Sequence, residues 1–332
     1  MNDLNPSSQP AAAEPAPRLP ARPRKWGISD FGPIGLLLAT VAGFFGEWHW
    51  LLDLATHFCW YYFIAAAVWL IVALRWRTHW ITGCLAVVLI WNGILLLPYY
   101  WPMASPVNPD SGKSFSLISL NVHTSNTDKK AVVDYLRQRQ PDIVIVIEID
   151  VEWGAALQSL NDIYPHRLMQ PRPDNFGIGL MSKIPLNEPR VMNFGGSNLP
   201  SVVTAIRHDG RDLQVIGTHP LPPIGHERAS RRNAQLHAVA EFVKQSPLPT
   251  IVAGDLNATP WSSAFRDFQS RSGLSDSAWG RGVHGTWNAQ TWWMRIPIDH
   301  VLIPPGAKVI ERTVGPHVGS DHFPVEATMI LP

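Results

Sequence analysis

Two long apolar stretches near the N-terminus, residues 58–74 and 80–100, contain no charged side chain. A helix needs about 20 apolar residues, with a range of about 17–25, to cross a bilayer, and both stretches meet that length. A third stretch, residues 31–54, precedes them and is interrupted by Glu47, His49 and Asp53. These stretches predict a bundle of three transmembrane helices over residues 29–101. The alternative is a buried helical hairpin of a soluble protein, in which uncharged runs of this length are rare.

The basic residues around these stretches predict their orientation. Residues 1–28 are rich in Pro, Ala and Ser and carry several basic side chains, which is typical of a disordered tail. Arg75 and Arg77 lie between the second and third stretches, whereas no Lys or Arg lies between the first and second. Because Lys and Arg favour the cytoplasmic side of a membrane, we expect a multi-pass protein of the cytoplasmic membrane with its tail inside. Everything after Trp101 is then extracytoplasmic.

The composition changes after the third stretch. Residues 102–112 contain three prolines and predict a linker, and residues 113–332 have the composition of an ordinary α/β domain. Of the 27 Lys and Arg residues six precede Asp110, and of the 26 acidic residues five do, which leaves 21 of each in the later part. An enzyme that binds nucleic acid usually has an excess of basic residues, and none is visible here. Cys59 and Cys84 both lie in apolar stretches, so no disulfide is available to the later part.

The central motif of the later part is residues 250–260, where a short β-branched strand runs into Gly254-Asp255-Leu256-Asn257. Side chains at i and i+2 of an extended segment point the same way, so Asp255 and Asn257 can face one point. A carboxylate can accept a proton from water, and a carboxamide can donate to a phosphate oxygen. The alternative is a turn in which both side chains cap their own backbone.

Polar side chains recur at the ends of other predicted strands. Apolar patterns predict strands at residues 115–122, 142–147, 177–182, 201–207, 213–218, 250–253, 296–303 and a last one at the C-terminus. They predict helices at residues 128–140, 152–160, 226–244 and 262–270. The strand ends carry side chains able to bind a metal or phosphate, namely Asn121, Glu148, His219, Asp255, Asn257, Asp299, Asp321 and His322. Taken singly, each of these is also typical of a helix cap, an ion pair or a hydrogen-bonded core residue.

In this order, these residues and motifs resemble the endonuclease/exonuclease/phosphatase superfamily over about residues 113–331. The resemblance implies a four-layer α/β sandwich, with two mixed sheets packed face to face and helices outside. It also implies an active site at one end of the sheets. The reaction that it implies is the hydrolysis of a phosphoester with Mg²⁺ or Mn²⁺.

Carried over to this sequence, the resemblance makes Glu148 the main metal carboxylate, supported by Asn121, with Asp321 as a further acidic group of the site. Such an oxygen-rich site suits Mg²⁺. Two positions depart from the repair-type endonucleases of the superfamily, because this chain has His123 where they have Asp and His219 where they have Tyr. These departures favour the branches with histidine there, which include secreted nucleases, sphingomyelinases and bacterial membrane-attached members.

The same resemblance implies the catalytic roles. Asp255 orients or deprotonates the attacking water, and Asn257 holds that water or a phosphate oxygen. His219 and His322 donate to the phosphoryl oxygens as charge builds up in the transition state. Asp299 is expected to pair with His322, because a carboxylate holds an imidazole in one tautomer and favours its charged form.

Two further features bear on the substrate. Trp292 and Trp293 lie in a loop just before the Asp299 strand and could insert into a bilayer or bind a lipid chain. Trp287 is expected to pack under the same loop. The predicted helix 226–244 carries Arg228, Arg231 and Arg232. Such a group of arginines is more typical of a solvated helix face than of a basic patch that binds a ligand.

The N-terminal architecture is also similar to that of the bacterial glycopeptide (teicoplanin)-resistance membrane proteins, a group that resembles polyprenyl pyrophosphate phosphatases. We therefore expect a membrane-anchored, metal-dependent phosphoesterase that acts on a lipid phosphate or pyrophosphate in the bilayer. One alternative is a membrane-anchored, Mg²⁺-dependent nuclease, with nucleic acid as its partner. Another is a non-catalytic membrane module that kept the fold; the presence of Glu148 and Asp255 argues against it.

Overall fold

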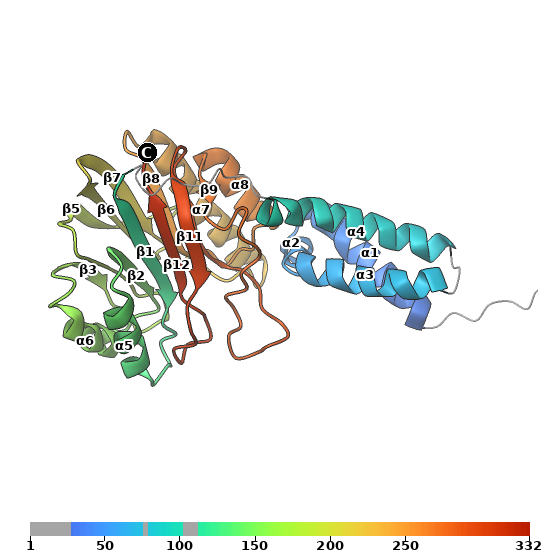
Figure 1. Ribbon diagram of the computed structural model, residues 1–332, viewed down its shortest axis with the longest axis horizontal. Coiled ribbons are helices and arrows are strands. Elements are labelled where there is room, and N and C mark those ends of the chain that lie inside the picture. Colours follow the sequence, from blue (N-terminus) through green and yellow to red (C-terminus); the bar gives the residue numbers. More distant parts are fainter. Residues whose placement is uncertain (1–27, 76–78, 102–111) are drawn as a thin grey trace, which may run out of the picture.

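The computed structural model describes residues 28–75, 79–101 and 112–332, which form a bundle of apolar helices joined at one end to an α/β sandwich (Figure 1). Three predicted features lie outside the described residues. These are the tail up to residue 27, residues 76–78 between the last two apolar stretches, and linker residues 102–111.

The sandwich contains two six-stranded sheets (Figure 1). The first has the order β11-β12-β1-β2-β4-β3, with bounds Lys308–Val314, Val325–Ile330, Ser114–Asn121, Ile143–Ile147, Ile178–Ser182 and His166–Gln170. The second has the order β5-β6-β7-β8-β10-β9, with bounds Asn187–Asn193, Pro200–His208, Arg211–Gly217, Thr250–Asp255, Asp299–Ile303 and Ser275–Asp276. Each sheet is mixed, because β1 pairs with β2 in parallel and with β12 antiparallel, while β8 pairs with β7 in parallel and with β10 antiparallel.

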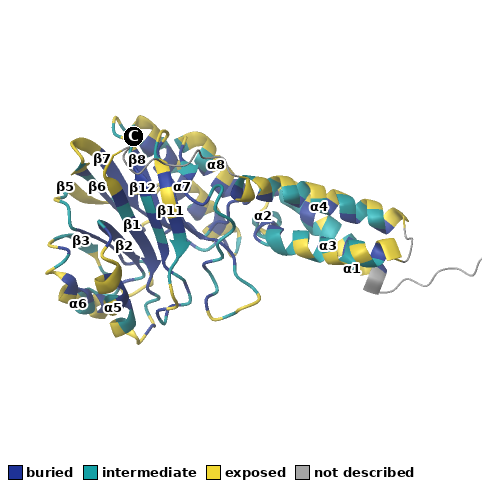
Figure 2. Ribbon diagram, in the orientation of Figure 1, coloured by how far each residue is buried: buried dark blue, intermediate teal, exposed yellow. Residues whose placement is uncertain are grey.

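The alternation of side chains along the strands builds the layers. In β1, Phe115 and Leu117 point into the core between the sheets, whereas Ile118 and Leu120 point to the helices outside. All five residues of β2 are buried, as expected of a strand covered on both faces (Figure 2). Helices α5 (Lys129–Arg139) and α6 (Val151–Leu157) pack on the first sheet, and α7 (His226–Gln245) and α8 (Ser263–Ser272) pack on the second. The predicted arrangement of two packed mixed sheets flanked by helices is confirmed.

Most of the predicted strands and helices agree with the structure to within a few residues. The strands that the sequence did not indicate are β3, β5, β9 and β11. Of these, β5 is exposed along nearly its whole length and its sequence is largely polar, so it lacks the apolar alternation that marks a strand. In each case a neighbouring strand of the sheet stabilises the segment, and the local sequence does not indicate that neighbour.

The N-terminal helices differ from the predicted bundle in one respect. The stretch 31–54 is not one helix but α1 (Ile28–Ala42), a 3₁₀ turn (Gly43–Phe45) and α2 (Trp50–Thr56), and the two helical parts are bent by 120°. A new helix begins at Trp50 because the Nδ1 atom of His49 accepts a hydrogen bond from the backbone nitrogen of Leu51 at 3.2 Å.

Helices α3 (Cys59–Arg75) and α4 (His79–Tyr100) follow the predicted second and third stretches. Among the described residues, only α4 is a single helix long and apolar enough to cross a membrane, and the bent α1–α2 pair passes the same test as one broken span. With 17 residues, α3 is a shorter apolar helix. Three membrane crossings therefore stay a prediction.

The end of α4 joins the bundle to the sandwich. The carbonyl oxygens of Pro98 and Tyr99 accept hydrogen bonds from the backbone nitrogens of Gly280 and Gly282 at 2.9 and 2.6 Å. The last carbonyl groups of a helix have no partner within the helix, and here loop residues of the sandwich supply it. The ring of Tyr99 also meets the buried ring of Trp261 edge to face.

Candidate active site

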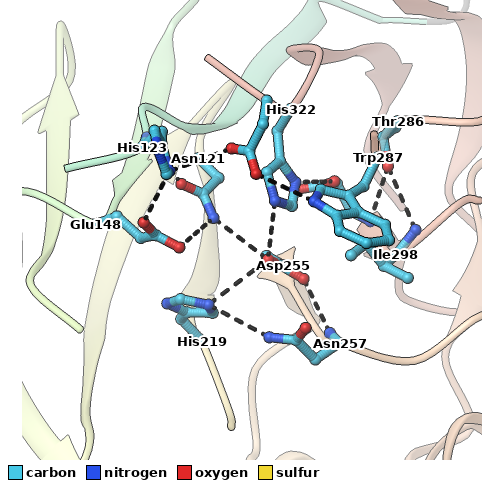
Figure 3. A network of polar contacts seen from close by, with 12 residues as sticks. Asn121, His123, Glu148, His219, Asp255, Asn257, Thr286, Trp287, Ile298 and His322 are labelled. Atoms are coloured by element: carbon cyan, nitrogen blue, oxygen red, sulfur yellow. Dashed lines mark hydrogen bonds and ion pairs between the residues drawn. The ribbon is translucent and has the colours of Figure 1, made fainter. Parts of the chain in front are cut away.

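The predicted polar residues converge at one end of the sandwich (Figure 3). Parallel pairing brings the end of β1 next to the end of β2, where Asn121 and Glu148 lie. In the second sheet, Asp255 at the end of β8 pairs directly with Asp299 at the start of β10. His219 follows β7, and His322 precedes β12. Each sheet therefore contributes side chains to one site between them.

Asp255 lies at the centre of this site. Its Oδ2 atom lies 3.3 Å from the Nδ2 atom of Asn121, 3.5 Å from Nε2 of His219 and 3.7 Å from Nε2 of His322. Its Oδ1 atom accepts a hydrogen bond from the backbone nitrogen of Asn257 at 2.9 Å. The carboxylate is thus shared by two imidazoles and one carboxamide, from both sheets.

Gly254 allows β8 to place Asp255 there. Its φ is +153°, and an added Cβ would lie 2.0 Å from the carbonyl oxygen of Thr218, which directly follows the neighbouring strand β7. No side chain fits into that space, so a glycine is required before the carboxylate.

The predicted pair of Asp299 and His322 is present. Nδ1 of His322 lies 2.8 Å from Oδ2 of Asp299, and both residues are buried. Burial opposes the charged imidazole, but the carboxylates of Asp299 and Asp255 outweigh it and raise the pKa of His322 to about 10. His322 is therefore an imidazolium at neutral pH, with its Nδ1 proton donated to Asp299.

His219 and Asp255 are matched in the same way. Burial opposes the charged form of His219, but the neighbouring Asp255 carboxylate raises its pKa above the ordinary value. For Asp255, burial opposes ionisation, whereas the His322 and His219 imidazoles lower its pKa to about 2. The site thus holds a carboxylate between the His322 imidazolium and the His219 imidazole, whose pKa this carboxylate raises.

Asn257 is held away from its own backbone. Its Nδ2 atom donates to the carbonyl oxygen of Pro220 at 3.0 Å, which fixes the loop after β8 against the loop after β7. The residue has φ of +49°, in the left-handed region. His123 and Glu148 also have positive φ, at +57° and +64°. Left-handed backbone in residues other than glycine is uncommon, and it clusters at functional sites.

Glu148 and Asn121 form the second half of the site. The Nδ2 atom of Asn121 donates to Oε1 of Glu148 at 2.9 Å, and its Oδ1 atom accepts from the backbone nitrogen of His123 at 3.0 Å. The hydroxyl of Thr124 donates to the backbone carbonyl of Glu148 at 2.8 Å. The carboxylate of Glu148 is held in place and still lines an open cavity.

Asp321 lines the same cavity. Its Oδ2 atom accepts a hydrogen bond from Nε1 of Trp287 at 3.1 Å. Its Oδ1 atom lies 3.3 Å from Nδ1 of His123, and it has no hydrogen-bond partner among residues 28–75, 79–101 and 112–332. His123 also lies 3.7 Å from Oε2 of Glu148, so it stands between the two carboxylates.

This part of the site fits a divalent cation. The carboxylates of Glu148 and Asp321 line one cavity, and the buried Oδ1 atom of Asp321 lacks a hydrogen-bond donor. Oxygen ligands of this kind suit Mg²⁺, and the nearby imidazole of His123 also suits Mn²⁺. Asp255, Asp299 and His322 also lie close enough to hold a metal ion. There, however, His322 keeps its proton, as its raised pKa indicates, and its Nδ1 atom is bound to Asp299, so it is not free to act as a ligand.

Three contributors to the site were not assigned to it from the sequence. His123 was noted only as a departure from a family pattern, and Trp287 was expected to pack under its loop, whereas it binds Asp321. His57, from the segment between α2 and α3, lines the same cavity. Nothing in the local sequence of these residues indicates their contacts, because each contact joins distant parts of the chain.

The comparisons with known proteins agree with this geometry. Residues 118–322 match the model of the endonuclease/exonuclease/phosphatase family. A protein named Phospholipase C from Staphylococcus aureus is 29% identical over 131 residues, which is 35% of this chain and 39% of that protein. The chain therefore matches about two fifths of the length of that relative.

Solved structures share the fold. TDP2 of D. rerio, in complex with a single-strand DNA product, is 18% identical over 66% of this chain and 99% of that one, with a TM-score of 0.57. A mutant beta toxin of Staphylococcus aureus with bound magnesium ions is 18% identical over 65% of this chain and 99% of that one, with a TM-score of 0.50.

The match to the family model covers more than half of the chain, and it spans the strands and loops that carry Glu148, Asp255 and His322. Members of that family are metal-dependent hydrolases of phosphoester bonds. The chain belongs to the endonuclease/exonuclease/phosphatase family.

Proposed function

We propose that this protein is a membrane-anchored, metal-dependent phosphoesterase that hydrolyses a lipid phosphate or pyrophosphate at the outer face of the cytoplasmic membrane. The observation that carries the hydrolytic part is the shared Asp255 carboxylate between the His219 and His322 imidazoles, next to the Glu148 carboxylate. This set provides a water-orienting carboxylate and two imidazole donors at one point.

The side chains divide the reaction between them. Asp255 keeps its charge and accepts a hydrogen bond from the attacking water, which it orients toward phosphorus; its low pKa makes it a weak base. His322 and His219 donate to the phosphoryl oxygens, where negative charge grows in the transition state. Asp299 holds the His322 ring in place by the bond to Nδ1.

Glu148 and Asp321, with Asn121 orienting Glu148, would hold the divalent cation. When bound, Mg²⁺ or Mn²⁺ supplies positive charge to the phosphate oxygens and so favours attack by water. His123 then acts as a neighbour that sets the spacing of the two carboxylates or joins them as a ligand.

Several observations support a lipid rather than a nucleic acid as the substrate. The part of the chain after residue 110 has balanced charge. Trp292 and Trp293, on the loop before β10, are 86% and 59% exposed, which suits insertion into a bilayer surface. The apolar helices join the sandwich beside this loop, and the Staphylococcus aureus relative carries the name Phospholipase C. The teicoplanin-resistance group, with its similar architecture, makes a polyprenyl pyrophosphate the first substrate to test.

The test uses the full-length protein in detergent with Mg²⁺ or Mn²⁺. Phosphate release from a polyprenyl pyrophosphate, product release from a phospholipid, and cleavage of single- and double-stranded DNA are measured side by side. Turnover of a lipid without DNA cleavage is the expected result. DNA cleavage alone would show that the protein is a surface nuclease. It would also show that the balanced charge of the later part does not exclude nucleic acid as the substrate.

A further inference from the structure

The active-site cavity is not built by the sandwich alone. Its volume is about 630 Å³, and it is lined by site residues that include Glu148 and His322. Three other lining residues, Leu54, His57 and Phe58, come from the corner between α2 and α3. A segment of the apolar N-terminal helices therefore forms one wall of the site.

One end of this corner is fixed by Asp53. The Oδ2 atom of Asp53 accepts a hydrogen bond from Nη2 of Arg232 at 2.8 Å, and both side chains are buried. Its Oδ1 atom accepts from the backbone nitrogen and the hydroxyl of Ser263, at 2.7 and 2.8 Å. Arg232 also donates from Nη1 to the carbonyl oxygen of Asn257 at 3.0 Å, which links the corner to the loop after β8.

The other end of the corner is fixed by Tyr61. Its hydroxyl donates to the carbonyl oxygen of Arg295 at 2.9 Å and accepts from the backbone nitrogen of the same residue. Arg295 directly precedes Ile296, another residue of the cavity wall. Residues 53–61, which we call the corner wall, are thus held from both sides against the loops of the site.

Within the corner wall, His57 has an unused polar atom. The residue is 3% exposed, and its Nε2 atom has no hydrogen-bond partner anywhere in the described parts of the chain. Burial of an imidazole nitrogen without a partner is unfavourable, and a hydrogen bond to a ligand in the adjoining cavity would satisfy it. Its neighbours in the wall, Leu54 and Phe58, are apolar.

We propose that the corner wall recognises the lipid substrate. Leu54 and Phe58 contact the part of the hydrocarbon chain next to the phosphate, and Nε2 of His57 hydrogen-bonds an oxygen of the same head group. This inference rests on the proposed function and specifies how that site selects a membrane lipid.

The remaining lining favours a hydrocarbon chain as the occupant. Phe176, Ile224 and Ile298 add apolar surface to the cavity, which also holds the charged groups of Glu148 and Asp255. A ligand with both a phosphate and a hydrocarbon chain matches this mixed lining, with its phosphate at the catalytic residues and its chain along the corner wall.

The test compares long- and short-chain substrates with the same head group, on full-length protein in detergent. A long-chain polyprenyl pyrophosphate is set against isopentenyl pyrophosphate; if the protein turns over another lipid phosphate, its long- and short-chain forms are used. Leu54→Ala and Phe58→Ala are expected to lower kcat/KM for the long chain about tenfold each and to leave the short chain unchanged. Leu51→Ala and Ile64→Ala are the matched controls, because both residues are exposed on α2 and α3.

His57 is tested separately, since its contact is with the head group. His57→Phe is expected to lower kcat/KM for both chain lengths about tenfold, and His57→Gln, whose amide can reach the place of Nε2, is expected to restore most of it. Unchanged turnover of the short chain in Leu54→Ala also shows that the variant is folded.

The outcomes separate the two proposals. If the wild-type protein turns over a lipid phosphate but Leu54→Ala and Phe58→Ala affect both chain lengths equally, or neither, the corner wall does not recognise the chain. If the wild-type protein turns over no lipid phosphate with either metal, the proposed function is wrong, and this inference falls with it.

Discussion

At the scale of single residues, the site depends on how charge is shared around Asp255. The two imidazoles that approach its Oδ2 atom lower its pKa to about 2, so it orients water rather than removing a proton from it. Asp299 and Asp255 together keep His322 charged. The protonation of the Asp255 carboxylate is therefore linked to that of its two imidazole neighbours.

The pKa of His322 leads to a prediction for pH dependence. Because this pKa is raised from 6.5, the imidazolium is fully present below 6.5 and is lost as the pH rises through about 10. Activity is expected to fall over that alkaline range. Asp299→Asn removes the nearest carboxylate, so the alkaline fall should move to lower pH, which a pH profile of kcat/KM measures. An unchanged profile in Asp299→Asn would contradict the role of this pair.

Glu148 leads to a prediction for the metal. Glu148→Gln removes the charge of the main candidate ligand, and we expect the Mg²⁺ concentration needed for half-maximal activity to rise at least tenfold. Titration of activity with Mg²⁺ and Mn²⁺ measures this change. The control is Glu152→Gln, because Glu152 lies close in sequence and pairs with Lys129 at the surface. Equal metal requirements in wild type and Glu148→Gln would show that the metal binds elsewhere.

At the scale of helices and strands, Arg232 makes a contact that could not be predicted from the sequence. The arginines of α7 were expected on a solvated face, yet Arg232 is 1% exposed and binds Asp53, which lies 179 positions earlier. The same pair explains why a charged residue could interrupt the first apolar stretch. Its carboxylate is turned toward the sandwich, where it has an arginine as partner.

The pair of Asp53 and Arg232 predicts a coupled loss of stability. Arg232→Met leaves a buried carboxylate without its partner, which is expected to lower the free energy of unfolding by about 3–5 kcal/mol. Adding Asp53→Asn should recover part of that loss, because the unpaired charge is removed. Equilibrium denaturation in detergent measures both, and Arg228→Met, on the exposed face of α7, is the control. Strictly additive losses would contradict direct coupling.

The strand ends of the site could be predicted because the rule behind them is local. A buried strand such as β2 reads as an unbroken apolar run, and the first polar residue after it, Glu148, marks the edge of the sheet. The pairing of Asp299 with His322 also followed from their chemistry and from the family resemblance. The contacts of His57, His123 and Trp287 could not be predicted, since they arise only when separate elements pack together.

At the scale of the whole molecule, the apolar helices and the sandwich share the active site. The corner wall, the end of α4 and the Asp53–Arg232 pair each join the two parts through hydrogen bonds. A sandwich taken from the chain at residue 112 would lack one wall of its cavity and would leave Arg232 buried without a carboxylate. The apolar helices and the candidate active site are therefore joined in one structure.

The most direct measurement is turnover by the full-length protein in vesicles that contain a polyprenyl pyrophosphate, with Mg²⁺ supplied or chelated. We expect phosphate release that requires the metal and that falls about 10²-fold in Asp255→Asn, which keeps the shape of the side chain but not the charge that orients the water. Equal release by wild type and Asp255→Asn, or release that persists when the metal is chelated, would contradict a metal-dependent hydrolysis centred on Asp255.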